Sequence, residues 1–413
     1  MNIITRRTFL GQSLAAGAFA ILGNRAYGYV FDEQGKTPEG VDPNPLFAED
    51  LAADDPRRRQ NQFIPGGTTD SFDFRFGKDG TCTFLQLSDF HLCGGRLNSR
   101  EHVQFQKVCD RFKPSFAILT GDNVELRCKG LFELCAGGVA ELFQTRKLPF
   151  ALTFGNHDTE AIGKGWYTAA EQWAYYREVA KGLFIDRHDP KLIGGGASRI
   201  RINGTDGKPR FDLCVIDSGD YSPFKKKRRT FDSVRTPTVE WARKKLAEGV
   251  PTLFFQHIIV PEANEQCGHG IFRKTRPGEK GFTFRDKSYG CVVNEKRCTG
   301  VLKDGLGSMP LEHARNPLYL SKGQSIYDVW KNAKNFRGAY FGHDHMNSYD
   351  GVTTDGVRLG ACKTLSVCGY NDGDLSLRVF RVHEDGTFET DTFSERHPEG
   401  TGFWGKKTPL IKG

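Results

Sequence analysis

Residues 116–123 read Phe-Ala-Ile-Leu-Thr-Gly-Asp-Asn, an apolar run that ends abruptly in a glycine and an aspartate. The run predicts a buried strand, and the glycine predicts a turn directly after it. Asp122 then stands at the carboxyl edge of a sheet, where open α/β folds place their ligands. We therefore expect the other functional residues of this chain to gather around Asp122.

Composition narrows the class of protein. The chain has 413 residues, 38% of them hydrophobic and 12% aromatic, which suits one large α/β domain with insertions or two ordinary domains. These values argue against a disordered or fibrous protein. Part of the net charge of +8 lies in residues 1–28, which hold three arginines and no acidic residue. The remaining positive charge suits anionic substrates, and we expect no stable nucleic-acid partner.

Residues 1–28 resemble a twin-arginine export signal. Arg6 and Arg7 are followed by Phe9-Leu10, by a weakly apolar run over 14–22, and by the small residues of Ala26-Tyr27-Gly28. An ordinary secretory signal or a basic N-terminal arm is the alternative. The resemblance implies that the twin-arginine export machinery is a partner and that the protein is exported, to the periplasm or beyond. No other stretch predicts a membrane span.

Cysteine usage fits an exported protein. Eleven cysteines follow residue 28, and disulfides are permitted in an oxidising compartment. Cys291 and Cys298 lie close together in one loop-like segment and are the first pair to test. Because the number is odd, at least one thiol stays free or pairs between chains.

The chain alternates between strand and helix patterns. Residues 29–70 predict an extended arm, and a hairpin with its turn at Gly77–Gly80 follows. The segment 261–322 interrupts the alternation and predicts a lid or pocket wall. Residues 347–393 predict antiparallel strands, and residues 396–413 are expected to form a tail. Expected strands cover 82–88, 116–120, 149–154, 198–203, 211–217, 252–256 and 338–341, and expected helices cover 101–112, 130–145, 167–180, 237–248 and 324–333.

Five of the expected strands end in residues that can bind metals. A single aspartate or histidine there is usually a turn residue, but five clusters at one sheet edge would converge on a common volume. The clusters are Leu87-Ser88-Asp89-Phe90-His91, Leu119-Thr120-Gly121-Asp122-Asn123, Phe154-Gly155-Asn156-His157-Asp158, Phe255-Gln256-His257 and Phe341-Gly342-His343-Asp344-His345.

These clusters resemble the signature of the calcineurin-like metallophosphoesterases. That signature runs Asp-x-His, Gly-Asp, Gly-Asn-His-Asp/Glu, an isolated His and Gly-His-x-His, and every block occurs here in order over about residues 82–350. The resemblance implies an α/β fold, namely a four-layer α/β/β/α sandwich of two mixed sheets. It makes residues 71–395 the metallophosphoesterase domain, with 261–322 as its insertion.

The resemblance also implies a binuclear metal centre for hydrolysis of a phosphorylated substrate. Asp122 would bridge two ions of iron, zinc or manganese, and a metal-bound hydroxide would attack phosphorus. His157 would protonate the leaving oxygen or hold the phosphoryl group, with Asp158 fixing its tautomer. Asp344 would orient neighbouring ligands. The other ligands would be Asp89, His91 and His345 for the first ion, and Asn156, His257 and His343 for the second.

One position separates this chain from the purple acid phosphatases. They place a tyrosine three residues after the bridging aspartate, where this chain has Glu125, and they usually lack the equivalent of His91. The ligand set is nearer the purple acid phosphatase-like branch, which also has a Pro-Glu pair like Pro261-Glu262. We favour a phosphomonoester substrate. A phosphodiesterase for nucleotides or lipid head groups and a catalytically silent, metal-stabilised binding protein are the alternatives. Arg96 and Asn98 are candidate phosphate contacts or simply exposed loop residues.

Overall fold

The computed structural model describes residues 72–92, 97–125, 130–159, 167–189, 192, 196–220, 231–266, 273–274, 282–284, 287–290, 298–301, 325–402 and 404–406. The expected export signal, the arm, Arg96, Cys291 and most of the 261–322 insertion lie outside these residues. The proposed pairing of Cys291 with Cys298 therefore stays a prediction. Among the described helices, none is both long and apolar enough to span a lipid bilayer.

A five-stranded mixed sheet carries the first three motifs. Its order is β16-β15-β2-β3-β4, with β2, β3 and β4 parallel to one another and β15 antiparallel to both of its neighbours. Every residue of β3 is buried, as the apolar run predicts. The strands are β2 (Thr81–Leu87), β3 (Phe116–Thr120), β4 (Phe150–Thr153), β15 (Ser376–His383) and β16 (Phe388–Ser394).

An eight-stranded mixed sheet carries the last two motifs. Its order is β1-β5-β6-β7-β12-β14-β13-β11, and β6, β7, β12 and β14 form a parallel centre. The strands are β1 (Phe74–Arg75), β5 (Ala197–Asn203), β6 (Pro209–Ile216), β7 (Thr252–Gln256), β11 (Cys298–Val301), β12 (Phe336–Phe341), β13 (Ser348–Val352) and β14 (Arg358–Ala361). A small separate sheet from the insertion joins β8 (Arg273–Lys274), β10 (Lys287–Gly290) and β9 (Phe282–Phe284).

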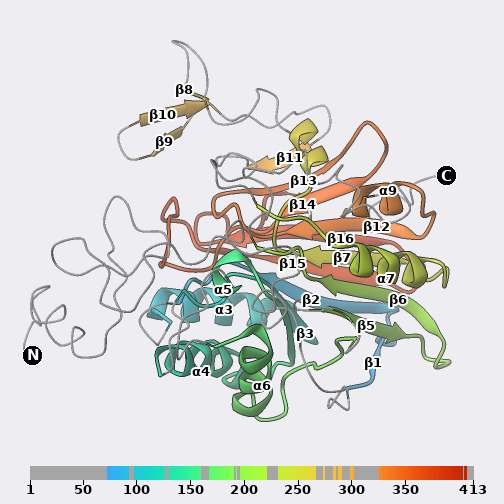
Figure 1. Ribbon diagram of the computed structural model, residues 1–413, viewed down its shortest axis with the longest axis horizontal. Coiled ribbons are helices and arrows are strands. Elements are labelled where there is room, and N and C mark those ends of the chain that lie inside the picture. The colour runs from blue at the N-terminus through green and yellow to red at the C-terminus, as the bar shows by residue number, and fades with distance from the viewer. Residues whose placement is uncertain are drawn as a thin grey trace, which may run out of the picture.

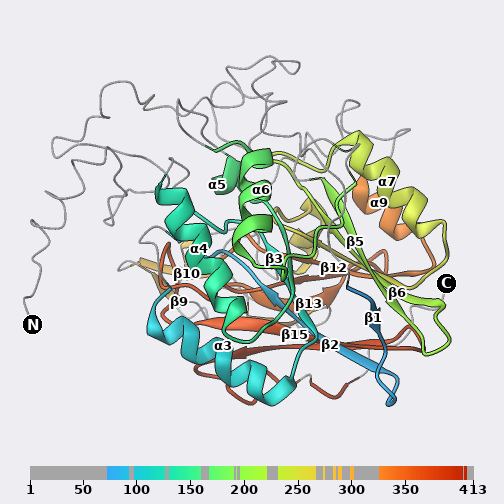
Figure 2. The same ribbon diagram turned by 90° about the horizontal axis from the view of Figure 1, so that it is seen from below.

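Helices cover the outer faces of both sheets, as Figures 1 and 2 show. One apolar core lies between the two sheets, a second joins the five-stranded sheet to α3, α4 and α6, and a third joins the eight-stranded sheet to α7 and α9. The four-layer α/β/β/α sandwich is therefore confirmed. The helices are α3 (Ser99–Phe112), α4 (Leu131–Gln144), α5 (Asn156–Thr159), α6 (Ala169–Val179), α7 (Thr236–Leu246) and α9 (Ile326–Lys331), with a 3₁₀ turn η1 (Pro261–Gln266).

Local signals in the sequence set the helix boundaries. Asn98 caps α3, because its side-chain oxygen accepts the Arg100 N–H at 2.9 Å while Glu101 reaches back to the Asn98 N–H. The same capping box begins α6 at Thr168 and α9 at Ser325. Asn98 thus has a structural role that explains its position without a phosphate contact.

The predicted N-terminal hairpin is wrong. The turn forms, since the Gly77 N–H donates to the Thr81 carbonyl at 2.9 Å, but the strands on either side of it enter different sheets. β1 pairs in parallel with β5, whereas β2 pairs with β3 and β15. Alternating phenylalanines before a glycine turn cannot distinguish these pairings, because Phe74 and Phe76 fill the core between the sheets in either case.

The C-terminal strands are antiparallel only in pairs. β13 with β14 and β15 with β16 are antiparallel, as predicted, but the two pairs belong to different sheets, and β14 runs parallel to β12. The described part of the segment expected to be a tail packs on β16. The Asp391 carboxylate accepts the backbone N–H groups of Thr401 and Trp404, and the Trp404 ring joins the core beneath α3.

Candidate metal centre

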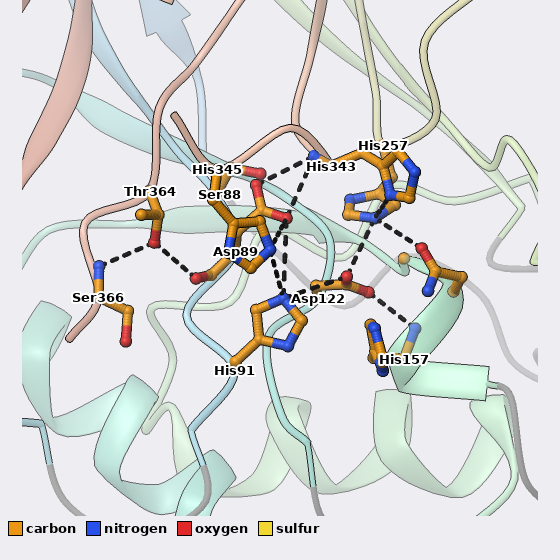
Figure 3. A network of polar contacts seen from close by, with 12 residues as sticks. Ser88, Asp89, His91, Asp122, His157, His257, His343, His345, Thr364 and Ser366 are labelled. Atoms are coloured by element: carbon orange, nitrogen blue, oxygen red, sulfur yellow. Dashed lines mark hydrogen bonds and ion pairs between the residues drawn. The ribbon is translucent and has the colours of Figure 1, made fainter. Parts of the chain in front are cut away.

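The two sheets meet at the carboxyl ends of their parallel strands. Buried Gln86 in β2 donates from Nε2 to the Phe341 carbonyl of β12 at 3.2 Å, and the His343 N–H donates to the Asp89 carboxylate at 3.0 Å. His257 Nδ1 contacts the Thr120 carbonyl at 2.8 Å. The His157 N–H donates to Asp122 Oδ1 at 2.8 Å, and together these bonds bring all five motifs, from both sheets, to one place (Figure 3).

The backbone of the motifs is strained. Seven non-glycine residues have positive φ in the part of the chain that the structure describes, and four of them belong to the motifs. These four are Asp89 (56°), His91 (44°), Asp122 (52°) and His343 (73°). Positive φ is unfavourable for such residues and persists where the surrounding structure enforces it, which is common at functional sites.

Two motif glycines allow the loops to approach one another. A Cβ atom on Gly155 would lie 2.2 Å from Asp122 Oδ1, and one on Gly121 would lie 2.7 Å from His257 Nδ1. Gly121 also has a φ of 90°. These glycines are therefore required for close packing of the loops rather than for contact with a ligand.

Four buried residues form the first cluster of potential metal ligands, Asp89, His91, Asp122 and His345. His91 Nε2 lies 2.9 Å from His345 Nε2 and 3.3 Å from Asp122 Oδ2, and His345 Nε2 lies 3.6 Å from Asp89 Oδ1. Figure 3 shows the four side chains facing one another. Two carboxylates and two imidazoles at these separations can share one cation.

A second cluster shares Asp122 and adds His257, His343 and Asn156. His257 Nε2 lies 3.2 Å from Asp122 Oδ2, from His343 Nδ1 and from Asn156 Oδ1. Asp122 Oδ2 is thus within 3.3 Å of a histidine from each cluster, His91 and His257. All seven predicted ligands come together, and Asp122 lies between the two clusters.

Hydrogen bonds aim the imidazole nitrogens into the clusters. His345 Nδ1 donates to the Tyr370 carbonyl at 2.7 Å, which leaves its Nε2 lone pair directed at Asp89 and His91. His257 Nδ1 donates to the Thr120 carbonyl, which turns Nε2 toward Asp122. A ligating histidine almost always donates its second nitrogen to an oxygen in this way. The donor set therefore fits a pair of metal ions.

Electrostatics favour positive charge at the same position. Burial opposes ionisation of Asp122, but His257, His157 and His91 outweigh it and hold the pKa of Asp122 well below its usual range. Burial also opposes the charged form of His91, yet Asp122 and Glu125 raise its pKa well above the usual value. Burial lowers the pKa of His343 and of His345 well below the usual range, so these rings are neutral and can donate lone pairs.

His157 lies beside the first cluster. Its backbone N–H donates to Asp122 Oδ1 at 2.8 Å, and its ring packs edge-on against His91 with centroids 4.8 Å apart. His157 is only partly buried, so the ring borders the clusters rather than lying inside them. This position suits a group that acts on a bound substrate.

Asp158 does not take its expected place beside the His157 ring. Its carboxylate instead accepts the backbone N–H groups of Gly155 at 2.8 Å, Asn123 at 3.0 Å and Val124 at 3.1 Å. Asp158 thus ties the loop after β4 to the loop after β3. Its acidic side chain has a clear physical role in shaping the site, and that role is not orientation of His157.

Glu125 is the carboxylate that faces His157, and the sequence did not suggest this role. Its Oε2 lies 2.6 Å from His91 Nδ1, and its Oε1 lies 3.5 Å from His157 Nδ1. Burial opposes ionisation of Glu125, but His157 and His91 lower its pKa to about 2. The spacing of three residues after Asp122 was the available signal. Asp344 accepts from the Asn347 side chain at 3.1 Å, behind the histidines on either side of it.

Comparison with known proteins agrees with these motifs. A family model described as calcineurin-like phosphoesterase matches residues 82–286. Phosphatase DCR2 of Saccharomyces cerevisiae is 24% identical over 294 residues, which cover 66% of this chain and 45% of that protein. The present chain thus spans about half the length of that relative.

Solved structures show only distant similarity. A conserved uncharacterized protein of Streptococcus pneumoniae, a predicted phosphoesterase, aligns with a TM-score of 0.28 at 9% identity over 79% of this chain and 96% of its own. The NAD nucleotidase of Haemophilus influenzae aligns with a TM-score of 0.37 at 11% identity over 76% and 50%.

The sandwich of two mixed sheets and the buried His/Asp clusters at their shared edge agree with the family that the motifs predict. Over residues 82–286, where the family model matches, the chain belongs with the calcineurin-like phosphoesterases.

Proposed function

We propose that this protein hydrolyses phosphate esters, with phosphomonoesters favoured, at a centre of two metal ions. One observation carries the proposal: the Asp122 carboxylate lies within 3.3 Å of His91 on one side and of His257 on the other. A carboxylate in that position can bridge two ions and would therefore set their separation. Such pairs lie about 3.5–4 Å apart in enzymes that cleave phosphate esters.

The two clusters supply the proposed ligands. Asp89, His91 and His345 would hold the first ion, Asn156, His257 and His343 the second, and Asp122 both. Mixed imidazole and carboxylate ligands suit iron, zinc or manganese. When bound, such ions activate water and neutralise charge on the phosphate oxygens.

The protein's own residues would handle the leaving group. His157 is anchored through its backbone to Asp122, and its ring packs against His91, which keeps the ring beside the clusters. Glu125 faces His157 Nδ1 and would favour a proton on that nitrogen, leaving the other ring nitrogen to serve the leaving oxygen. His157 would therefore act as the general acid, with Glu125, in place of Asp158, as the residue that positions it.

Hydrolysis by metal-reconstituted protein tests this function. We expect release of phosphate from an aryl phosphate and slower cleavage of the matching aryl phosphodiester. Exclusive diesterase activity would contradict the monoester assignment and favour the nucleotide or lipid head-group alternative, for which the presence of His91 beside His345 is the supporting observation.

Single Ala substitutions of Asn156 and of His157 distinguish an enzyme from the alternative, a catalytically silent binding protein. Both should lose activity, because Asn156 lies in the second cluster and His157 beside the first. Unchanged turnover in both variants would mean that the chemistry lies elsewhere.

We also propose that the chain belongs to the purple acid phosphatase-like branch and is exported by the twin-arginine pathway. Glu125 supports the branch, because it stands at the tyrosine position and contacts His91, a combination that leaves no tyrosinate to colour the protein. Arg6 and Arg7 support export. Fusion of residues 1–28 to a reporter that folds in the cytoplasm tests the pathway, and Lys at both arginines should abolish export.

A further inference from the structure

The loop over residues 362–375, which joins β14 to β15, lies against the first cluster. The Tyr370 carbonyl accepts from His345 Nδ1 at 2.7 Å, and the Tyr370 ring stacks on the His345 ring with centroids 4.0 Å apart and an angle of 8° between the planes. The Thr364 hydroxyl donates to the Asp89 carbonyl at 2.7 Å, as Figure 3 shows. One loop thus fixes the rotation of His345 and the backbone of Asp89.

A buried ion pair holds this loop in shape. Lys363 is 3% exposed, and its Nζ lies 2.7 Å from Asp372 Oδ1 and 3.0 Å from Asp374 Oδ2. Burying the Lys363 ammonium and the Asp374 carboxylate, with Asp372 partly exposed, has a large desolvation cost, so such a group is weak evidence for stability alone. Here it links the start of the loop to its end and thereby constrains the intervening residues, Tyr370 among them.

Two further contacts fasten the loop to its surroundings. Glu101, buried at the start of α3, accepts the Val367 N–H at 2.7 Å, and the Arg396 N–H donates to Asp374 Oδ1 at 3.0 Å. The conformation of the loop is therefore set from both sides. A Cβ atom on Gly369 would lie 3.0 Å from His345 Cε1, so the loop backbone also limits how far that ring can tilt.

We propose that the 362–375 loop is a positioning element for the first metal ion, with Lys363 and Tyr370 as its positioning residues. This inference rests on the proposed metal centre. Tyr370 acts directly, because it holds His345 in the tautomer and plane that direct Nε2 toward Asp89. Lys363 acts through the loop, because its two ion pairs keep the Tyr370 carbonyl in place. The loop contacts His345 and Asp89, which are both ligands of the first ion, so loosening it should affect the two ions unequally.

Cobalt titration of the full-length, metal-free protein tests the proposal without an activity assay. Cobalt absorption reports each ion separately, with His345→Ala and His257→Ala as spectral references for loss of the first and the second. In Lys363→Met we expect the affinity for the first ion to fall about 10–100-fold, the usual effect of removing a residue that supports a metal ligand. The affinity for the second ion should stay within about twofold.

Matched variants separate positioning from folding. Lys363→Arg should restore most of the affinity, because a guanidinium can still bridge the two carboxylates. Lys331→Met removes an exposed lysine whose Nζ pairs with Asp355 at 3.0 Å, and should change neither ion. Tyr370→Ala removes the ring that stacks on His345 and should weaken binding of the first ion. Tyr370→Phe keeps that ring and loses only the long contact of the hydroxyl with the His345 N–H at 3.4 Å, so its effect should be much smaller. If Lys363→Met does not fold, the comparison of Tyr370→Ala with Tyr370→Phe decides whether the loop positions the first ion.

Equal loss of both ions, or two unchanged ions in Lys363→Met and in Tyr370→Ala, would overturn the positioning role while leaving the metal centre intact. A wild-type protein that binds no cobalt would overturn the metal centre itself, and the loop proposal with it.

Discussion

The two halves of the proposed metal centre are held in different ways. In the half of Asp89, His91 and His345, both histidines are nearly inaccessible to solvent, and each has its Nδ1 fixed, by Glu125 at 2.6 Å and by the Tyr370 carbonyl at 2.7 Å. In the half of His257 and His343, His257 is fixed in the same manner, but His343 is only partly buried. Its ring is covered at one edge by Phe231, with centroids 4.2 Å apart.

This difference indicates unequal roles for the two ions. Ligands that are pre-oriented lose less freedom when they bind, so the first ion should bind more tightly. The second ion, beside the more accessible His343, should exchange more easily. Asp122 joins the two halves, and His157 lies against the first half while bonded to Asp122.

Removal of Asp122 should abolish binding of both ions, so that no difference between the two halves remains. In Asp122→Ala, we expect loss of both ions and a fall in activity of at least about 10⁴-fold, because each ion contributes several kcal/mol to catalysis. Elemental analysis and phosphate release measure the two effects. Asp73→Ala, which removes an exposed carboxylate paired with Arg75, is the control. A variant that retains one full equivalent of metal would refute a shared ligand.

Replacement of His157 should leave both metal ions bound and remove the general acid. His157→Ala keeps the backbone N–H that bonds Asp122, so both ions should remain. We expect kcat to fall about 10²–10³-fold for alkyl phosphates and less for aryl phosphates with acidic leaving groups, since these need no proton. A loss of equal size for every leaving group would contradict the acid role.

Neutralising Glu125 should weaken binding of the first ion more than binding of the second. Glu125→Gln removes the charge that faces His91 and His157, so we expect about a 10-fold loss in affinity for the first ion together with a lower kcat. Asp158→Asn offers the contrast. It disturbs three backbone N–H bonds and should cost about 1–3 kcal/mol of folding free energy while leaving kcat of the folded enzyme nearly unchanged. Thermal unfolding and kcat together separate the two cases, and the opposite pattern would restore Asp158 as the partner of His157.

Mild chelation should reveal a difference in affinity between the two ions, the smallest of the effects predicted for this site. Dialysis of the loaded protein against a weak chelator should remove one equivalent first, with affinities that differ about tenfold. The cobalt spectrum of the remaining ion should match that of His257→Ala, in which the second ion is missing. Simultaneous loss of both ions would show that the halves are held equally.

Those parts of the site that depend on local sequence could be predicted. Asp89, Asp122 and His257 each follow an apolar strand, and parallel strands bring their carboxyl ends to one edge, so the convergence of the motifs follows from the pattern itself. The capping boxes of α3, α6 and α9 each involve residues only three positions apart, so they too depend on local sequence.

Contacts between distant segments could not be predicted. The pairing of β1 with β5 depends on how the two sheets assemble, and alternating phenylalanines fit either partner. Tyr370 is 25 residues from His345, in a loop with no motif. Asp158 and Glu125 are both acidic residues near His157, and only the folded loops show which of them faces the ring.

Anomalous diffraction from crystals of the zinc- or manganese-loaded protein tests the central claim most directly. We predict two peaks about 3.5–4 Å apart, with an oxygen of Asp122 bound to both, one peak beside His345 and the other beside His257. A single peak, or two peaks of which one makes no contact with Asp122, would contradict the account.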